Sequence, residues 1–259
     1  MDFYIICVLY NKEIKDINSL AAFLEFRSIK KNINIMIFDN SIDTNIVNKN
    51  KKYKNSAINY YYNDGNLGLS KVYNLGLKKI NSKSYAVMLA DDDTNFSIDY
   101  LLNAYDEILQ RQTHIVTGII LSNGKVMSPK KSIYEPSFVN QPGSYKNIYA
   151  INSGLVFDDF VVSQLGEFDE RLFLDMIDFW FAKKVFQLGI EDVCVVSGNI
   201  EQDFSGSQKR NINAEKKRFQ IYSNDVKSFI EIFPEEKAKM KKVLLKRWIN
   251  INVIHRLKK

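Results

Sequence analysis

Three consecutive aspartates, Asp91 to Asp93, directly follow the apolar run 85–90. The run predicts a buried strand, so the acids would lie at the carboxyl edge of a sheet, where open α/β sheets bind ligands. Clustered carboxylates suit a hard cation such as Mg²⁺ or Mn²⁺, which commonly shares them with a substrate diphosphate. The alternative is a solvated turn before a helix over 98–111 that Ser97 would cap. The triplet therefore predicts either a metal and diphosphate site or a helix start.

A second acidic pair, Asp175 and Asp178, lies three residues apart at the start of a predicted helix, which would place both carboxylates on one face. Aromatic residues surround the pair, and partial desolvation by them would raise a carboxylate's proton affinity. Such a carboxylate suits a general base that takes a proton from an acceptor hydroxyl. The alternative for Asp178 is an ordinary acid in the first turn of a helix.

The elements that must position these acids alternate as in a Rossmann-like α/β unit. The pattern predicts strands over 3–9, 33–38, 57–62, 85–90, 113–121, 151–157 and 190–196. It predicts helices over 17–31, 70–79 and 98–111, a turn and helix over 169–188, and a helical region from Ala214 onward that breaks at Pro234. Short strands that are apolar on both faces indicate a mixed, mainly parallel sheet. The irregular stretch 122–150, rich in proline and tyrosine, is predicted to frame an acceptor.

Composition narrows the class of protein. The chain of 259 residues is 46% hydrophobic with 4 prolines, which indicates a globular domain with a large core. No apolar run approaches the ~18 residues of a membrane span, and two cysteines in apolar runs fit a reducing cytoplasm. Nine of the 36 Lys and Arg residues lie in 237–259, which contains no acid, so the rest of the chain is slightly acidic. A nucleic-acid-binding body is therefore not expected.

Five segments, taken in order, carry a family resemblance: Cys7-Val-Leu-Tyr-Asn-Lys-Glu13, Ile37-Phe-Asp-Asn-Ser-Ile-Asp43, Asn66-Leu-Gly-Leu-Ser-Lys-Val-Tyr-Asn-Leu-Gly76, Leu89-Ala-Asp-Asp-Asp-Thr94, and Asn152-Ser-Gly-Leu with 166–178. Over about residues 3–205 the chain resembles the inverting family-2 glycosyltransferases of the GT-A fold, specifically the rhamnosyltransferase-like branch that builds bacterial surface polysaccharides. The resemblance implies a GT-A catalytic domain over 1–212, with a nucleotide-binding half at about 1–121 and an acceptor half at about 122–212. Residues 213–259 would form a C-terminal helical, basic amphipathic segment.

The resemblance implies a role for each matching residue. The segment containing Tyr10, Asn11 and Glu13 would wrap the nucleoside, while Asp39 would contact the base beside Asn40. An Asx-type turn is the alternative at 39–41. Glycine allows close backbone approach and helix N-terminal amides favour an anion, so Asn66, Gly68 and Asn74 are donor-site candidates, with a plain turn and helix cap as the alternative.

In the acid triplet, the resemblance implies a DxD element. Asp91 would contact the ribose and the metal, Asp93 would bind Mg²⁺ or Mn²⁺, and Asp92 would belong to the donor site. The catalytic base aligns best with Asp178, and Asp175 is the second choice.

The chain departs from the family at three places. Trp180 and Lys184 stand where the family often has Glu and Arg, and the stretch 200–207 lacks the family's late histidine. Gln202 or Asp203 is predicted to substitute for that histidine as a metal or diphosphate contact. These departures leave open a non-catalytic, polysaccharide-assembly member of the same fold. A nucleotidyltransferase is a further alternative, although residues 8–15 contain no glycine for a phosphate loop.

Read as a helix, residues 237–259 place Met240, Val243, Leu244, Trp248, Ile251 and Ile254 on one stripe between basic residues. Such a helix would bind an anionic membrane surface, or it would pack on the catalytic domain with a solvated basic face. The sequence thus predicts a cytoplasmic enzyme, peripheral on the inner face of the cell membrane. It would move a sugar from a nucleotide diphosphate sugar to a lipid-linked saccharide acceptor in O-antigen or capsular polysaccharide synthesis.

Overall fold

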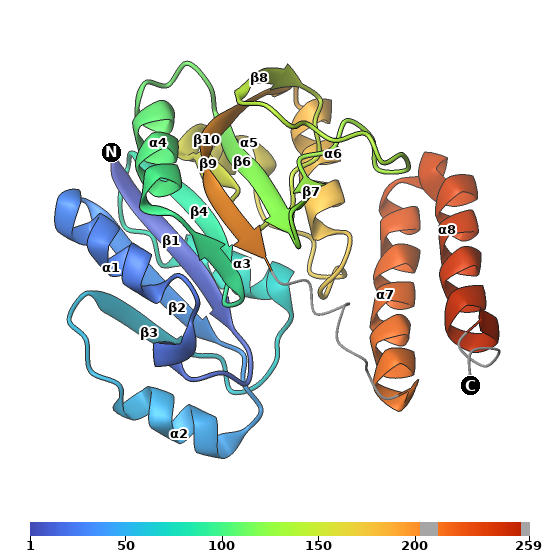
Figure 1. The fold of residues 1–259 in the computed structure, drawn as a ribbon, viewed down its shortest axis with the longest axis horizontal. Coiled ribbons are helices and arrows are strands. Elements are labelled where there is room, and N and C mark those ends of the chain that lie inside the picture. The colour runs from blue at the N-terminus through green and yellow to red at the C-terminus, as the bar shows by residue number, and fades with distance from the viewer. Residues whose placement is uncertain (203–211, 255–259) are drawn as a thin grey trace.

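A computed structural model describes residues 1–202 and 212–254 of the chain (Figure 1). The strands are β1 Asp2–Leu9, β2 Ile33–Asp39, β3 Ile58–Tyr62, β4 Tyr85–Asp91, β5 Thr94–Phe96, β6 Ile115–Ser122, β7 Lys125–Ser128, β8 Gly143–Lys146, β9 Val156–Asp158 and β10 Asp192–Gln202. The α-helices are α1 Leu20–Ile29, α2 Thr44–Lys52, α3 Leu69–Lys78, α4 Ile98–Leu109, α5 Asp159–Leu165, α6 Ile177–Gln187, α7 Ile212–Ile232 and α8 Lys237–Ile249.

Within the described residues, the ten strands form one mixed sheet in the order β3-β2-β1-β4-β9-β6-β10-β5, with β7 beside β6 and β8 beside β10. Strands β3, β2, β1 and β4 run parallel, as do β6 and β10. Strand β9 is antiparallel to both β4 and β6 and joins the two parallel parts. The predicted α/β fold with a mixed, mainly parallel sheet is confirmed.

Both faces of the sheet are buried, as the apolar strand sequences predict. Along β1, Phe3, Ile5, Cys7 and Leu9 pack with helices α1 and α4, whereas Tyr4, Ile6 and Val8 point to the opposite face and pack with α3 and α6. This alternation follows from the two-residue period of a strand. The carboxyl ends of β1, β2 and β4 are thereby fixed side by side, which is what positions the site.

The C-terminal helices share the core of the sheet. Tyr222, Val226 and Phe229 of α7 and Met240 of α8 are buried in the same cluster as α3 and α6. Figure 1 shows α7 and α8 side by side, with α7 between α8 and the rest of the molecule. The predicted apolar stripe of α8 is therefore divided: Met240 is 1% exposed, whereas Trp248 is 48% exposed. Within 1–202 and 212–254, no helix is long and apolar enough to cross a membrane.

Two helices were not predicted from the sequence. Helix α2 lies in a stretch read only as polar, because most of its residues are Asn or Lys; it forms because Asp43 caps it, accepting from Asn45 N at 2.9 Å, and because Val47 is buried. Helix α5 follows β9 directly, within a segment that has no glycine or proline to mark a boundary. The strand predicted over 151–157 is also shorter, since it begins only at Val156.

Candidate active site

A cleft of about 510 Å³ opens at the carboxyl edge of the parallel strands. Parallel register sets Val8 of β1 beside Asp91 of β4 and Leu9 beside Asp39 of β2, so polar residues after all three strands reach one place. The cleft is lined by Val8, Tyr10, Asn40, Asn66, Gly68, Leu69, Asp91, Asp92, Asp93, Phe173, Leu174, Arg218 and Ile221. It thus combines segments of the first hundred residues with the loop before α6 and with helix α7.

The aspartate triplet directs its side chains to two different neighbours. Asp91 Oδ2 and Asp93 Oδ1 both accept from the amide Nε2 of Gln202, at 3.2 and 3.1 Å. The pKa of Asp91 is raised to about 7, chiefly by burial and also by the charges of Asp93 and Asp92, against a lowering effect of the Gln202 hydrogen bond. Burial likewise raises the pKa of Asp93. Because both acids resist ionisation without a counter-charge, the pair favours a bound cation.

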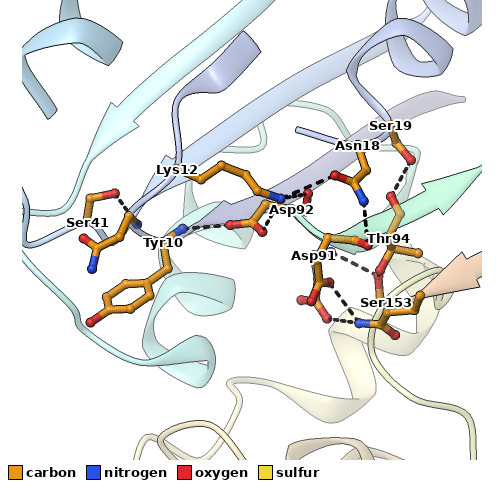
Figure 2. Close-up of polar contacts among 12 residues, drawn as sticks. Tyr10, Lys12, Asn18, Ser19, Ser41, Asp91, Asp92, Thr94 and Ser153 are labelled. Atoms are coloured by element: carbon orange, nitrogen blue, oxygen red, sulfur yellow. Dashed lines mark hydrogen bonds and ion pairs between the residues drawn. The ribbon is translucent and has the colours of Figure 1, made fainter. Parts of the chain in front are cut away.

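Asp92 instead points toward the end of β1 (Figure 2). Its carboxylate accepts from the Tyr10 N–H at 2.9 Å and pairs with Lys12 Nζ at 3.1 Å. Lys12 also donates to the Asp92 carbonyl at 2.7 Å. Asp92 lines the cleft, but its charge is already balanced by Lys12, so it holds the 10–12 segment in place.

The backbone of the triplet is fixed by small polar residues that sequence reasoning missed. The Asp91 N–H donates to Ser153 Oγ at 3.0 Å, and Ser153 Oγ lies 2.7 Å from Thr94 Oγ1. Asn18 donates to the Asp93 carbonyl at 3.0 Å, and Ser19 Oγ donates to the Thr94 carbonyl at 2.6 Å (Figure 2). The sequence signal was that Ser153 and Thr94 lie inside segments that carried the family resemblance, whereas Asn18 and Ser19 lie outside them.

Asp91 and Asp93 could supply two oxygen ligands to a divalent cation. Among residues 1–202 and 212–254, no three His, Cys, Asp or Glu side chains converge on one metal position. The donor set nevertheless fits Mg²⁺ or Mn²⁺, since Mg²⁺ is usually held by one or two carboxylates together with substrate phosphates and waters. Gln202 Oε1 is buried without a partner among the described residues, and rotation of its amide would turn this oxygen toward the same cation. Asp203, the other predicted substitute for histidine, lies outside the described residues.

Of the remaining predicted donor residues, the structure brings Tyr10, Asn40, Asn66 and Gly68 to the cleft. Tyr10 is 46% exposed at its mouth. Asn40 Oδ1 accepts from Asn63 Nδ2 at 2.8 Å, which orients the amide, and Asn66 Oδ1 accepts from the Gly68 N–H at 3.1 Å. These residues, with the aspartate triplet, are the part of the lining that comes from the first hundred residues.

Four predicted donor residues lie around the cleft and do not line it. Asn11 Oδ1 accepts from the N–H groups of residues 42 and 43, and Glu13 pairs with Lys15 and Lys49 at the surface. Asp39 is fully buried and accepts from Tyr60 Oη, Asn50 Nδ2 and the Ser41 N–H, at 2.8, 2.8 and 2.9 Å. Asn74 exchanges two hydrogen bonds with the backbone of Phe168. In this arrangement each of the four fastens a loop.

The start of helix α3 is joined to the loop before α6. Leu69 N donates to the Phe173 carbonyl at 2.7 Å. Gly68 has a φ of 79°, and a Cβ there would lie 2.6 Å from the Phe173 ring and 2.7 Å from its carbonyl oxygen. Only glycine fits both the backbone conformation and the contact. The start of α3 and the loop at Phe173 are therefore directly joined.

Asp178 lies in the first turn of α6, which begins at Ile177 after Met176 in a left-handed conformation. Its pKa is raised to about 6, chiefly by burial and also by the charge of Asp175, against the lowering effects of the Phe179 N–H and the charge of Lys130. The charge of Asp178 also raises the pKa of Asp91, so the two acidic clusters lie close enough to interact. The fully buried Tyr73 ring is subject to both charges.

Asp175 precedes the helix instead of sharing a helical face with Asp178. Its carboxylate forms a two-pronged ion pair with Arg218 of α7, with Nη2 to Oδ1 at 2.6 Å. The backbone N–H groups of Phe173, Leu174 and Asp175 donate to Asp225 of α7, at 2.9, 2.9 and 2.7 Å. Arg218 and Asp225, neither predicted from the sequence, thus attach the 173–175 loop to helix α7.

This fold, with a cleft of nucleotide-binding type at the carboxyl edge, defines a glycosyltransferase of the GT-A class. The glycosyl transferase family 2 model matches residues 4–164, and the chain belongs to that family. The dTDP-rhamnosyl transferase RfbF of Shigella flexneri is 22% identical over 195 residues, which are 72% of this chain and 64% of that protein. The chain therefore spans a little under two thirds of this relative's length.

Solved structures of TarS from S. aureus share the fold. TarS 1-349 superimposes with a TM-score of 0.58 at 14% identity, covering 97% of this chain and 81% of that one. The same protein in complex with UDP-GlcNAc gives 0.58 at 15% identity, covering 96% and 73%. At these identities the likeness concerns the fold.

Proposed function

We propose that the protein transfers a sugar from a nucleoside diphosphate sugar to a saccharide hydroxyl by single displacement, with inversion at the anomeric carbon. The observation that carries this proposal is the cleft that the aspartate triplet shares with Phe173 and Leu174, on the loop that leads to Asp178. Asp175 and Asp178 do not themselves line the cleft. Donor binding is assigned to residues 1–121 and acceptor binding to 122–212. The 213–259 region completes the site, since α7 contributes Arg218 and Ile221 to the cleft.

Asp178 is the proposed general base. As the acceptor oxygen forms its bond to the anomeric carbon, its proton passes to the Asp178 carboxylate. The bond from the anomeric carbon to the phosphate oxygen breaks at the same time, and its electron pair leaves with the nucleoside diphosphate. A pKa of about 6 keeps Asp178 ionised at neutral pH and gives it more basicity than an exposed aspartate.

Asp93 and Asp91 are the proposed metal ligands, with Gln202 as the third oxygen donor. When bound there, Mg²⁺ or Mn²⁺ supplies positive charge that stabilises the departing diphosphate. Tyr10, Asn40, Asn66 and Gly68 are the proposed contacts to the nucleoside and phosphates, supported by their place on the cleft wall. Asp175 is assigned to the support of this site through Arg218.

The name of the dTDP-rhamnosyl transferase relative supports a rhamnosyl donor. A hexosyl donor and a place in bacterial O-antigen or capsular polysaccharide synthesis are further parts of the proposal. The family match favours sugar transfer over nucleotidyl transfer. A non-catalytic member of the family is the remaining alternative. The burial that raises the pKa of Asp178 favours a catalytic enzyme over a non-catalytic member of the family. A solvated acid at the start of a helix would not acquire such a pKa.

A direct test measures nucleoside diphosphate release from UDP- and dTDP-sugars with Mn²⁺, after a thermal-shift screen has selected the stabilising donor. The anomeric configuration of the product, read by NMR, tests inversion. Asp178→Asn is expected to slow release about 10²–10⁴-fold, while Asp106→Asn, which removes an aspartate that pairs with Lys30 at the surface, is expected to retain it. Donor release by Asp178→Asn at the wild-type rate would refute the assignment of the base.

We further propose that α8 rests on an anionic membrane, which would bring the enzyme to a lipid-linked acceptor on the cytoplasmic face. Leu245, Trp248 and Ile249 are exposed on α8, at 59%, 48% and 37%, beside a surplus of Lys and Arg. Leu245→Ser with Trp248→Ser is expected to reduce co-sedimentation with phosphatidylglycerol vesicles. Both residues are exposed, so the fold should persist, whereas deletion of α8 would remove the buried Met240. Unchanged co-sedimentation would exclude this surface.

A further inference from the structure

Arg218 of α7 is the one cationic side chain among the described residues that line the cleft. The same cleft carries three aspartates, and the nearby Lys12 is bound to Asp92 outside the lining set. A nucleoside diphosphate entering this cleft would meet these carboxylates. Among the described lining residues, Arg218 is the protein's own source of opposite charge.

The guanidinium of Arg218 contacts Asp175 through two of its nitrogens. Arginine has five N–H donors in a planar fork, and this ion pair uses two of them. The same fork geometry matches phosphate oxygens as well as carboxylate oxygens. The Arg218 side chain is 26% exposed and lines the cleft while it is paired with Asp175.

The ion pair is not required to hold the loop that carries Asp175. Asp225 already accepts the three consecutive backbone N–H groups of 173–175, and Leu69 donates to the Phe173 carbonyl. A purely structural role would therefore duplicate existing contacts. These contacts do not explain why the Arg218 side chain lines the cleft.

We propose that Arg218 binds the diphosphate of the donor through the N–H donors that its ion pair with Asp175 leaves free. This inference rests on the proposed function and adds to it a cation supplied by the C-terminal helices. Arg218 would hold the phosphates in the cleft that Asp91 and Asp93 also line. As the glycosidic phosphate bond breaks, the charge that develops on the leaving diphosphate would strengthen this contact.

The test compares binding of UDP with UMP, and of dTDP with dTMP, by calorimetry at a fixed Mn²⁺ concentration. Arg218→Gln is expected to weaken the diphosphate that the wild type binds by about tenfold, and its monophosphate by no more than about twofold. Lys227→Gln, on an exposed position of the same helix, makes the same charge change and should alter neither. Arg218→Lys keeps the charge without the fork and should lie between; it carries the test if the Gln variant does not fold.

Asp175→Asn separates binding from support. It releases the guanidinium from a competing carboxylate, so diphosphate affinity should stay equal or rise. A fall as large as that of Arg218→Gln would show that the pair serves only the protein fold and would overturn the proposal, as would equal losses for diphosphate and monophosphate. If the wild type binds neither UDP nor dTDP, the proposed function itself fails; if it binds one that Arg218→Gln binds equally well, only this inference fails.

Discussion

Gly68 and Phe173 touch so closely that the glycine has no room for a side chain: a Cβ would lie 2.6 Å from the ring and 2.7 Å from the carbonyl oxygen. Both residues line the cleft, one at the start of α3 and the other before α6. Their contact directly joins the start of α3 to the loop at Phe173. Changes on either side of it should therefore affect both nucleotide binding and catalysis.

Gly68→Ala tests this contact. The substitution adds both left-handed backbone strain at φ 79° and a clash with backbone, so we expect stability to fall by about 2–4 kcal/mol and donor affinity to fall with it. Gly124→Ala is the matched control, since its φ is 71° but nothing lies within 4 Å of its Cβ. Chemical denaturation and donor titration of both variants measure the difference. Equal losses in the two would mean that the Phe173 contact contributes nothing.

The pH dependence of transfer should follow Asp178. Its pKa is about 6, so it is protonated below that value and cannot accept the hydroxyl proton. We expect kcat/KM to fall about tenfold per pH unit below 6 and to level off above it. Asp178→Asn should lose about 10²–10⁴-fold in kcat and lose this limb of the profile. A wild-type profile that is flat between pH 4.5 and 7.5 would contradict the assignment.

The same carboxylate should reduce stability at neutral pH. Its folded pKa is raised from 3.8 to about 6, so between these values the unfolded chain is ionised while the folded protein retains the proton. Stability contributed by this group is thus present below about pH 4 and is lost as pH rises through 6. Asp178→Asn should raise the free energy of unfolding at pH 8 by on the order of 1–3 kcal/mol, with little gain at pH 4. Urea titrations of both proteins at pH 4 and pH 8 measure this difference. A variant that is less stable than the wild type at pH 8 would show that favourable contacts of the Asp178 carboxylate outweigh the cost of burying its charge.

Asp225→Asn should loosen the 173–175 loop. One oxygen of Asp225 accepts from Phe173 and the other from Leu174 and Asp175, whereas an asparagine has a single acceptor oxygen. Loss of the other acceptor leaves N–H groups unpaired and should cost about 1–3 kcal/mol together with a drop in kcat. Glu231→Gln, exposed on the same helix, is the control. Thermal unfolding and turnover are measured for both variants. Equal changes in the two would show that the hydrogen bonds of Asp225 do not support the site.

Within the triplet, metal dependence should separate Asp93 from Asp92. Asp93→Asn is expected to raise the Mn²⁺ concentration for half-maximal activity by at least ~10-fold, because it removes one of two carboxylate ligands. Asp92→Asn alters a side chain that pairs with Lys12, and it should leave this concentration nearly unchanged. Metal titrations of donor turnover test both. The reverse order would place the cation on the other side of the triplet.

The sheet and the acids after its strands could be predicted because both signals are local. An apolar run sets a buried strand, and parallel strands end at one edge, so Asp91 and Asp93 could be assigned to a cleft. Gly68 was also identified as a point of close backbone approach. The residue that approaches it, Phe173, is more than a hundred positions away, and no local pattern connects the two.

Contacts made across long stretches of chain could not be predicted. Asp225 and Arg218 occupy an amphipathic helix in which isolated charges are usually solvated, and nothing in their spacing indicates that they face a loop fifty residues earlier. Asp39 shows the opposite case: it follows its strand as predicted, but Tyr60 and Asn50 enclose its carboxylate. The predicted secondary structure placed these residues on their helix or strand, but their hydrogen-bond partners depend on tertiary packing that the local sequence does not reveal.

The clamp between Asp225 and residues 173–175 bears on how this enzyme could be recombined with its relatives. A chimaera that joins the catalytic domain of one enzyme to the C-terminal helices of another would replace Arg218 and Asp225, which hold the 173–175 loop. Such a chimaera should be active only when Asp225 and residues 173–175 come from the same parent protein. The C-terminal helices and the loop at 173–175 are thus coupled through these hydrogen bonds, so a change in one constrains the other.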